Sequence, residues 1–584
     1  MLYYPTVSCR NANEAKDISI RMEKASEGIS YAHISFSFDE PTSPSKATFI
    51  FRVPCIDVFS TWRPRAGMER HVGPNWKKLD SKSRLAFGAP VLSMIAKNGN
   101  NRVTAALSNA QIPTSISCGV VEETSELEFR IDIFTEVMSP MTSFEITLRI
   151  DERDIPFHDA LSDTERWWRT DLGFVEARVP DAARLPMDSL WYSFHQELDP
   201  DAILAECRAS KALGMDTVII DDGWQTDDNN RGYSYCGDWE VTPTKIPDMK
   251  KLVDDLHAIG MKVIIWFSVP YVGVHSRAYD RFEGMYLLGS RDRSVMTLDP
   301  RYPEVRKYLV DTYVHAVKSY GLDGLKLDFI DAFRLSDMSV GKTFDGKYMS
   351  LEDGLEMLLD ETMTELSRVN PDIMIEFRQA YIGPTIRKYG NILRVADCPN
   401  DAQSNRLGVL DLRLISGGTA IHSDMIMWNK DETNEAAAVQ LQSVLFGVPQ
   451  ISLRVPDLND GHKALLSNYL SFWRAHREVL LDGALTVKNP EMGYSMASAE
   501  KDGTTVAARY LPVSFTIDKP NRYHLFNATA EETVVMTLDQ SLSFVYTVRD
   551  CLGNELQSGK IADKGAFCIS APMGACIEMI PVQA

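Results

Sequence analysis

The sequence lacks the features that mark several large classes of protein. It contains no apolar run near the roughly 18 residues of a membrane span, so we expect no membrane association. It also has no dense cluster of Lys and Arg, and its 61 basic and 81 acidic side chains give a net charge of −20. Because binding to phosphate backbones requires clustered positive charge, we expect no nucleic acid as a partner.

Paired cysteines and a leader segment are also missing. Nine cysteines are scattered from Cys9 to Cys576 without CxxC spacing. This pattern is typical of reduced thiols rather than of a disulfide framework or a zinc site. The first residues show neither the basic nor the apolar stretch of a secretory signal. We therefore expect a cytoplasmic protein.

The pattern that is present divides the chain into three parts. Apolar and polar residues alternate at period two in 31–38, 127–134 and 142–150, and again in 504–510, 533–538 and 544–549, which predicts β-strands near both ends. Between the strands of the first part, residues 62–80 form a long irregular segment rich in Arg, Pro and Trp, and such loops are often functional.

The middle of the chain alternates short apolar runs with helical stretches. Strands are predicted at 190–194, 217–220, 263–267, 325–329, 373–377, 392–395, 419–422 and 448–452, and helices at 200–213, 247–260, 304–320 and 351–369. Eight strands over about 270 residues predict a parallel (β/α)₈ (TIM) barrel. A doubly wound open sheet is the competing α/β fold, but no G-x-G-x-x-G or P-loop follows the first strand.

The predicted architecture is therefore α/β, with a central barrel between two β domains. We place an N-terminal β-sandwich at residues 1–178, the barrel at 179–484 and a small C-terminal antiparallel β-sandwich at 485–584.

In such barrels the reactive residues follow the strands. Here they are carboxylates, cations and indoles: Trp191, Tyr192, Asp221, Asp222, Trp224, Trp266, Lys326, Asp328, Asp331, Arg378, Gln379, Arg394, Asp397, Asp401, His422, Asp424 and Trp428. This mixture suits sugars, because charged groups hydrogen-bond hydroxyls and aromatic faces pack on C–H faces.

Two carboxylates at strand ends, Asp328 and Asp397, fit glycoside hydrolysis, which needs one ionised carboxylate and one proton donor. Lys326 lies two residues before Asp328 and faces the same side of its strand, where its ammonium would keep that carboxylate ionised. The alternative is an ion pair that only fills the barrel centre. Likewise, Asp221 and Asp222 either line the pocket or cap a helix.

Several motifs together resemble glycoside hydrolase family 36 and its clan, the α-galactosidases or melibiases. They are Trp191-Tyr192-Ser193-Phe194, Asp221-Asp222-Gly223-Trp224, Gly237-Asp238-Trp239, Gly260-Met261-Lys262 and Lys326-Leu327-Asp328-Phe329, in family order over about residues 185–455. The three-part layout is also similar to that of the family.

The resemblance implies roles for individual residues. Asp328 matches the nucleophile and Asp397 the acid/base, with Asp401 as the alternative proton donor. The implied substrate-binding residues are Asp221 and Asp222 for the 4- and 6-hydroxyls, Trp224 beside them, Trp191, Trp266 and Lys326 lining the sugar, Arg394 before the acid/base, and Trp62 reaching over the barrel mouth.

The sequence departs from the family after the fifth strand, where many relatives carry a Cys- and Gly-containing stretch near the sugar's 2-position. Here Arg378 and Gln379 stand in its place, so we expect a differently shaped pocket. Arg378 either contacts an anionic or differently configured sugar, or pairs with Asp397 or Glu376 without touching substrate.

The expected function is that of a retaining, exo-acting α-glycosidase, and first of all an α-galactosidase acting on oligosaccharides or glycosides by double displacement. Its two carboxyl groups should lie about 5–5.5 Å apart. The alternatives are a clan-related glycosidase or transglycosylase with another, for example anionic, glycone, or a non-catalytic carbohydrate-binding barrel. We expect no metal and no organic cofactor. Clan relatives often form homo-oligomers, although nothing in this sequence marks an interface.

Overall fold

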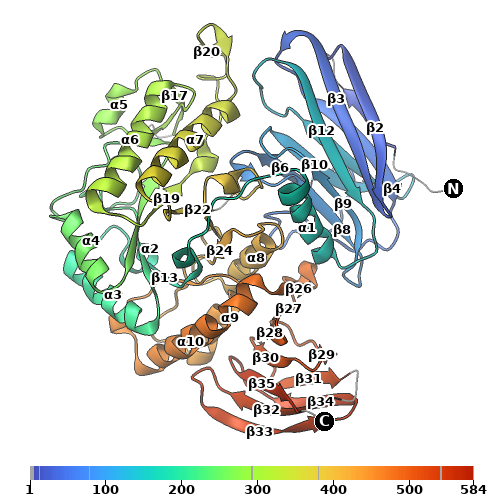
Figure 1. Cartoon of the computed structure of the whole chain (residues 1–584), viewed down its shortest axis with the longest axis vertical. Helices are drawn as coiled ribbons and strands as arrows, with labels where there is room; N and C mark the ends of the chain where they lie inside the picture. Colours follow the sequence, from blue (N-terminus) through green and yellow to red (C-terminus); the bar gives the residue numbers. More distant parts are fainter. Residues whose placement is uncertain are drawn as a thin grey trace.

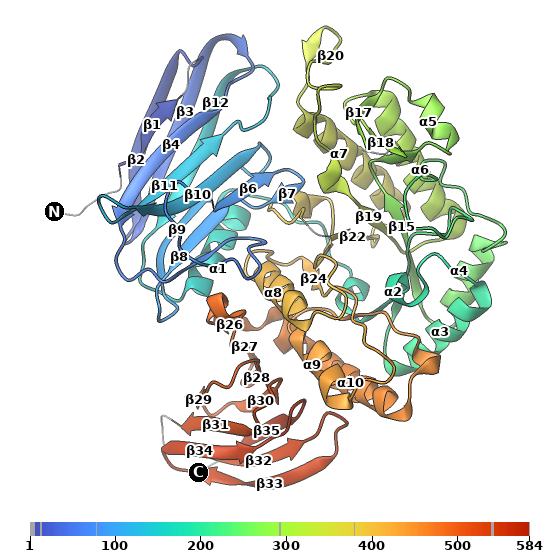
Figure 2. The same ribbon diagram turned by 180° about the vertical axis from the view of Figure 1, so that it is seen from behind.

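The chain forms three parts, shown from two sides in Figures 1 and 2. The computed structural model describes residues 6–11, 14–77, 79–290, 294–378, 380–538 and 542–582. The N-terminal β domain lies beside the barrel, and the C-terminal β domain packs below the last barrel helices (Figure 1).

The predicted barrel is confirmed. Its eight parallel strands follow the order β24-β23-β22-β19-β15-β14-β13-β25, and a parallel bridge from His422 to Val448 joins its two ends. The strands are β13 (Met187–Ser189), β14 (Thr217–Ile220), β15 (Lys262–Ser268), β19 (Gly324–Asp328), β22 (Met374–Arg378), β23 (Ile392–Arg394), β24 (Ala420–His422) and β25 (Gln450–Ile451).

Helices cover the outside of the barrel (Figure 2). They are α3 (Pro200–Leu213), α4 (Met249–Ala258), α6 (Pro303–Tyr320), α7 (Leu351–Val369), α8 (Ala402–Arg413), α9 (Asn434–Ser443) and α10 (Asp460–Asp482). After β15, the chain inserts β16 (Tyr271–Gly273), α5 (Arg277–Arg281), β17 (Tyr286–Gly289) and β18 (Val295–Leu298), and after β19 the hairpin β20 (Thr343–Phe344) and β21 (Lys347–Tyr348).

The first strand differs from the prediction. Residues 190–194, predicted as a strand, contain the short helix α2 (Trp191–Phe194), and the strand β13 lies just before it. Strand β13 reads Met-Asp-Ser, so it has no apolar run. The buried Asp188 in its middle is hydrogen-bonded by Ser210 Oγ at 2.6 Å. Periodicity alone does not separate a short apolar strand from a helical turn.

The inward-facing side chains of the barrel change from apolar to charged along the strands. Near the strand starts, Met187, Ile219, Ile264, Met374, Ile392 and Ala420 form one apolar cluster. Because alternate strand residues share a face, the residues two positions later also point inward. These include Trp266, Lys326, Glu376 and Arg394, and they lead to Asp328 and Arg378 at the strand ends.

The N-terminal domain is a sandwich of two six-stranded antiparallel sheets with an apolar interior. Its strands are β1 (Ser8–Asn11), β2 (Asp17–Ser26), β3 (Ile29–Thr42), β4 (Ala47–Pro54), β5 (Ser60–Trp62), β6 (Asp80–Arg84), β7 (Phe87–Gly88), β8 (Val91–Ile95), β9 (Asn101–Leu107), β10 (Thr114–Val121), β11 (Glu126–Ile133) and β12 (Met141–Asp151). Helix α1 (Phe157–Arg166) follows it on the way to the barrel.

The C-terminal domain packs a seven-stranded sheet on a three-stranded one. Its strands are β26 (Ala484–Lys488), β27 (Met496–Lys501), β28 (Thr504–Arg509), β29 (Phe515–Ile517), β30 (Arg522–Asn527), β31 (Thr533–Leu538), β32 (Ser543–Arg549), β33 (Glu555–Ala562), β34 (Gly565–Ser570) and β35 (Cys576–Pro581). The pairing is antiparallel except that β28 pairs with β30, and β29 with β31, in parallel.

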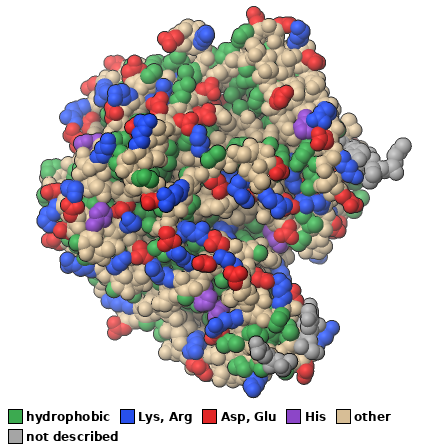
Figure 3. Space-filling model, viewed as in Figure 1, with side chains coloured by type: hydrophobic (Ala, Val, Ile, Leu, Met, Phe, Trp, Pro, Cys, Tyr) green, Lys and Arg blue, Asp and Glu red, His purple; other side chains and the backbone are tan. Residues whose placement is uncertain are grey.

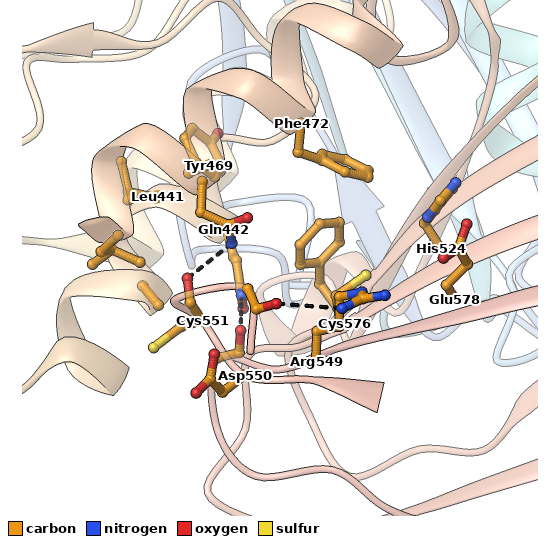
Figure 4. A pocket seen from close by; sticks show the side chains of 16 residues that line it. Leu441, Gln442, Tyr469, Phe472, His524, Arg549, Asp550, Cys551, Cys576 and Glu578 are labelled. Atoms are coloured by element: carbon orange, nitrogen blue, oxygen red, sulfur yellow. Dashed lines mark hydrogen bonds between the residues drawn. The ribbon is translucent and has the colours of Figure 1, made fainter. Parts of the chain in front are cut away.

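The C-terminal domain leaves a small cavity where it meets the barrel (Figure 4). This cavity of about 170 Å³ lies between Leu441, Tyr469 and Phe472 of α9 and α10 and the strand residues His524 and Phe526. Its lining includes none of the predicted site residues, so it is separate from the barrel mouth.

The described part of the chain has no helix that is both long and apolar enough to cross a membrane. On the face shown in Figure 3, acidic and basic side chains are interspersed rather than gathered by sign.

One buried carboxylate joins all three parts. Asp411 of α8 accepts hydrogen bonds from Trp62 Nε1 at 2.9 Å, from Arg70 Nη2 at 2.6 Å and from the Tyr494 hydroxyl. Trp62 and Arg70 belong to the first domain and Tyr494 to the last, and the Arg70 side chain is fully buried. Removing one partner of a buried ion pair is strongly destabilising, because the other charge is then left uncompensated.

We expect Asp411→Ala to lower the free energy of unfolding by about 3–5 kcal/mol, because it leaves the Arg70 guanidinium buried and unpaired. The matched control is Asp311→Ala, which removes an exposed i,i+4 partner of Lys307 and should cost less than about 0.5 kcal/mol. Thermal unfolding of both variants measures the difference. Equal unfolding temperatures would contradict the structural role of Asp411.

Candidate active site

Arg378 connects the two predicted catalytic carboxylates. Its Nε donates to Asp328 Oδ1, and its Nη1 donates to Asp397 Oδ2 at 3.3 Å. The side chain is 5% exposed, and its guanidinium carbon lies 4.6 Å from the centre of the Phe329 ring. One guanidinium thus brings Asp328 and Asp397 together at the carboxyl ends of β19 and β23.

Asp328 is held by three donors. Besides Arg378, Trp266 Nε1 donates to Oδ2 at 2.8 Å, and the backbone N–H of Phe329 donates to Oδ1 at 2.7 Å. Phe329 adopts a φ of 63°, which is uncommon for a bulky residue and turns the chain sharply at the strand end. These donors fix the orientation of the Asp328 carboxylate.

The cation next to Asp328 differs from the expected one. Lys326 does face inward, but its Nζ pairs with Asp221 Oδ2 at 2.5 Å. Register explains this: Lys326 lies one inward position deeper than Asp328, level with Trp266 of the neighbouring strand. Arg378, at the end of the adjacent barrel strand β22, supplies the positive charge for Asp328 instead.

Asp397 lies at the edge of the site, with its side chain 40% exposed. Arg394 Nη2 donates to its Oδ1 at 2.8 Å, in addition to the bond from Arg378. Partial burial works against ionisation, but the positive charges of Arg394, Arg378 and Lys326 outweigh it and lower the pKa of Asp397 well below its usual range. In this state of the site, Asp397 is therefore a base rather than a proton donor.

Arg394 is itself fixed by a second buried carboxylate. Its Nη1 donates to Asp424 Oδ1, and its Nε lies 3.6 Å from Glu376 Oε1. Asp424 also accepts from the Tyr192 hydroxyl at 3.0 Å and from the backbone N–H of Cys398 at 2.6 Å. Burial raises the pKa of Asp424 despite the adjacent guanidinium.

Asp221 and Asp222 directly follow β14, which ends at Ile220, so strand alternation no longer separates them. Asp222 is 3% exposed and accepts from Gln196 Nε2 at 2.8 Å and Gln225 Nε2 at 2.6 Å. Burial raises the pKa of Asp222 to about 6. Neither residue caps a regular helix, so the alternative interpretation as a helix cap does not apply.

The aromatic residues divide into two groups. Trp266 contacts Asp328 and stacks on Tyr233, with ring centres 6.1 Å apart, and Trp191 is half-buried on α2 against His195. Trp224, by contrast, is fully buried, and its Nε1 donates to the Trp266 carbonyl at 2.9 Å. Trp224 therefore supports Trp266 from the core and has no surface to offer a ligand.

Other predicted residues lie elsewhere. Trp62 is buried at the three-domain junction, not over the barrel mouth, because its indole N–H is bound by Asp411. Asp401 caps the N-terminus of α8, because its side chain accepts hydrogen bonds from the backbone N–H groups of Gln403 and Ser404. Gln379 lies outside the described residues.

Asp424 and Tyr192 are among the residues predicted to follow the barrel strands, but the resemblance assigned them no role. Gln196 and Gln225 could not be predicted as site residues, because amides in loops follow no sequence pattern. His422 is a buried hydrogen-bonding residue: its Nε2 lies 2.7 Å from the Ala183 carbonyl, and burial lowers its pKa to about 4. Among the described residues, no group of three or more His, Cys, Asp or Glu side chains is placed to hold a metal ion.

The fold and the site together define a (β/α)₈ barrel with a carboxylate pair at its mouth, an arrangement of carbohydrate-active enzymes. Residues 177–377 match the melibiase family model, which confirms the resemblance that the motifs indicated. The matched segment covers about a third of the chain. It contains Asp221, Asp222, Lys326 and Asp328 and stops one residue before Arg378.

Curated relatives are similar in sequence to this chain over a limited stretch. The chain is 26% identical over 197 residues to the bifunctional α-galactosidase/sucrose kinase AgaSK of Mediterraneibacter gnavus, which covers 32% of this chain and 19% of that protein. It is also 26% identical to the α-galactosidase Mel36A of Lactobacillus acidophilus, over 26% of this chain and 22% of that protein. The matched part thus spans about a fifth of the length of these relatives.

The similarity to a solved structure extends over nearly the whole chain. The crystal structure of the GH36 α-galactosidase AgaA from Geobacillus stearothermophilus, in complex with stachyose, superposes with a TM-score of 0.67 at 15% identity. The superposition covers 95% of this chain and 80% of that one. At this identity the likeness shows the fold.

We expect Arg378→Met to lower stability more at pH 7 than at about pH 2.5, well below the unfolded pKa of an aspartate. In the wild type, the lowered pKa of Asp397 contributes stability that is present above the unfolded pKa of about 3.9 and is lost as pH falls. Without the guanidinium that contribution is reduced and the two carboxylates repel each other. The loss should be about 3–5 kcal/mol at pH 7, since a buried partner is removed.

Thermal unfolding at both pH values measures this effect. Arg166→Met, which removes an exposed partner of Asp163, is the control and should show a small, pH-independent change. A loss for Arg378→Met that is equal at the two pH values would show that Asp397 does not depend on Arg378.

Proposed function

We propose that this protein is a retaining, exo-acting α-glycosidase that hydrolyses terminal α-galactosides of oligosaccharides or glycosides. One observation carries the proposal: Asp328 and Asp397, from strands far apart in sequence, lie close enough to share the Arg378 guanidinium. Two carboxylates so close at a barrel mouth suit double displacement, in which one attacks the anomeric carbon and the other transfers the proton. The melibiase match supports the galactoside.

In this mechanism Asp328 is the nucleophile. Trp266 and the Phe329 backbone N–H orient its carboxylate, so that one oxygen can attack the anomeric carbon. Asp397 protonates the leaving oxygen and then activates the water that releases the sugar. The pair formed by Lys326 and Asp221, together with Asp222, offers polar groups for the sugar hydroxyls.

Arg378 couples sugar entry to the protonation of Asp397. Its guanidinium lies between the two carboxylates, where the anomeric carbon must lie during attack. The sugar must therefore displace the guanidinium. Because Arg378 is one of the charges that lower the pKa of Asp397, its withdrawal raises that pKa toward the range of a proton donor.

A glycone other than galactose is the second candidate. The chain has the bulky Arg378 at the fifth strand end, where many clan members have small residues, and this side chain fills the space beside both carboxylates. Since both its Nε and its Nη1 already bind carboxylates, it is better placed to limit the shape of the glycone than to attract an anionic sugar.

A panel of nitrophenyl α-glycosides tests the function. We expect release of nitrophenol from the α-galactoside, and a loss of more than about 10³-fold in Asp328→Asn, because the nucleophile is removed. Proton NMR of the first product should show the α-anomer, as double displacement requires. Activity only on another α-glycoside would support the mechanism and show that the preferred glycone is not galactose. An initial β-anomer would contradict retention, and no turnover of any α-glycoside would contradict the proposal.

Substituting each of two neighbouring aspartates, Asp397 and Asp401, shows which one is the acid/base residue. Asp397→Ala should lose about 10²–10⁴-fold in kcat/KM on alkyl galactosides, whose leaving groups need protonation, and less on nitrophenyl galactoside. Asp401→Ala should keep activity within about threefold and lose only about 1 kcal/mol of stability through the α8 cap. The reverse pattern would assign the proton transfer to Asp401.

A further inference from the structure

A cavity of about 330 Å³ adjoins Asp397 on the side of α8. Its lining comes from three places in the sequence: the first-domain loop, the chain after β22 and the segment from the end of β23 through α8. The lining residues are Pro64, Arg65, Gly67, Met68, Ile382, Val395, Ala396, Asp397, Cys398, Ser404, Leu407, Gly408, Asp411, Leu412 and Ile415. Asp397 therefore belongs both to the catalytic pair and to the wall of this cavity.

Most of the residues that line the cavity are apolar. Ile382, Val395, Leu407, Leu412 and Ile415 are all buried hydrophobic residues. Most of its polar members other than Asp397 are engaged within the protein. Asp411 binds Trp62 and Arg70, Ser404 Oγ donates to Asp401 Oδ2 at 2.5 Å, and the Arg65 guanidinium lies over the Phe87 ring at 4.7 Å.

The first-domain loop that closes the cavity is held firmly. Arg70 Nε donates to the Gly67 carbonyl at 2.8 Å while its Nη2 binds Asp411 of α8. On the other side of the loop, Arg63 Nη2 donates to the Glu69 carbonyl at 2.8 Å. Helix α8 lies beside the first domain in both views (Figures 1 and 2). The wall made by residues 64–68 is therefore formed before any ligand binds, which lowers the entropy cost of binding.

We propose that this cavity binds the leaving group, and that the preferred substrates carry an apolar alkyl or aryl aglycone. The inference rests on the proposed function, in which Asp397 protonates the leaving oxygen, so the aglycone must lie next to Asp397. A sugar in this position would bury hydroxyls against Leu, Ile and Val side chains without partners, which is costly, whereas an alkyl chain or aromatic ring loses only water. The volume suits a group of this kind.

Octyl and methyl α-galactosides form the matched substrate pair, because their leaving oxygens have similar basicity and only the apolar length differs. We expect kcat/KM for the octyl compound to exceed that for the methyl compound by at least about tenfold. Calorimetry with Asp328→Asn should show the same order in Kd, which provides a measurement that does not depend on turnover.

Met68 is the residue to vary, because it lines the cavity mouth and is 51% exposed, so substitution leaves the core intact. Met68→Asp should reduce the octyl-to-methyl ratio by at least about threefold, whereas Met68→Leu should retain it. The control is Met357→Asp, on the outer face of α7 and 41% exposed, which should leave the ratio unchanged.

The outcomes separate the two proposals. Turnover of both galactosides at similar kcat/KM, or a ratio that Met68→Asp does not change, overturns the aglycone site and leaves the glycosidase function intact. Hydrolysis of neither compound, with octyl binding to Asp328→Asn no tighter than methyl, overturns both. Tighter octyl binding without turnover supports the cavity and contradicts the hydrolytic function.

Discussion

Neutralisation of buried carboxylates inside the barrel is the constraint on which the site depends. An isolated ionised carboxylate is very costly to bury, so each one needs a cation or several donors. Lys326 neutralises Asp221, Arg378 pairs with Asp328, and Arg394 pairs with Asp424. These three cations come from three adjacent strands, so the charge balance holds only when the strands are in register. The arrangement of charged groups at the barrel mouth therefore depends on the register of the barrel strands.

The same balance of charges determines the ionisation state of Asp397 when no substrate is bound. Arg378 and Arg394 both contact Asp397, and their combined charge holds it ionised. A glycosidase of the proposed kind needs this carboxyl protonated at the moment of bond cleavage. Substrate binding must therefore change the surroundings of Asp397, and Arg378 is the group whose position the sugar most directly affects. Arg378 thus places a buried positive charge between the two proposed catalytic carboxylates.

The first domain also contributes to the barrel mouth. Arg84, at the end of β6, donates to the Phe333 carbonyl at 2.6 Å on the loop after β19. Trp62 and Arg70 bind Asp411 on α8 and hold residues 64–68 against the cavity beside Asp397. The irregular segment that the sequence marked as functional does border the site, but through Met68 and its neighbours. Trp62 anchors the segment from inside the domain junction.

Particular residues show how far sequence reasoning reached. Strands such as 217–220 were predictable because a strand covered on both faces is continuously apolar, and Asp328 was found because it directly ends such a run. Strand β13 was missed because the buried Asp188 interrupts its short run. The expectation that Trp224 binds substrate came from its motif, but that indole lies in the core, since adjacent motif residues on a turn can point to opposite sides.

The sequence by itself determined the barrel, its two flanking β domains and the identity of the carboxylates at the strand ends, because these follow from local periodicity and from the alternation of strand faces. Only the tertiary structure decided the pairing of charges: Lys326 with Asp221 rather than Asp328, and Arg378 with both Asp328 and Asp397. Pairing depends on the depth of each residue in the barrel and on contacts between strands far apart in the chain. No local pattern in the sequence encodes that depth.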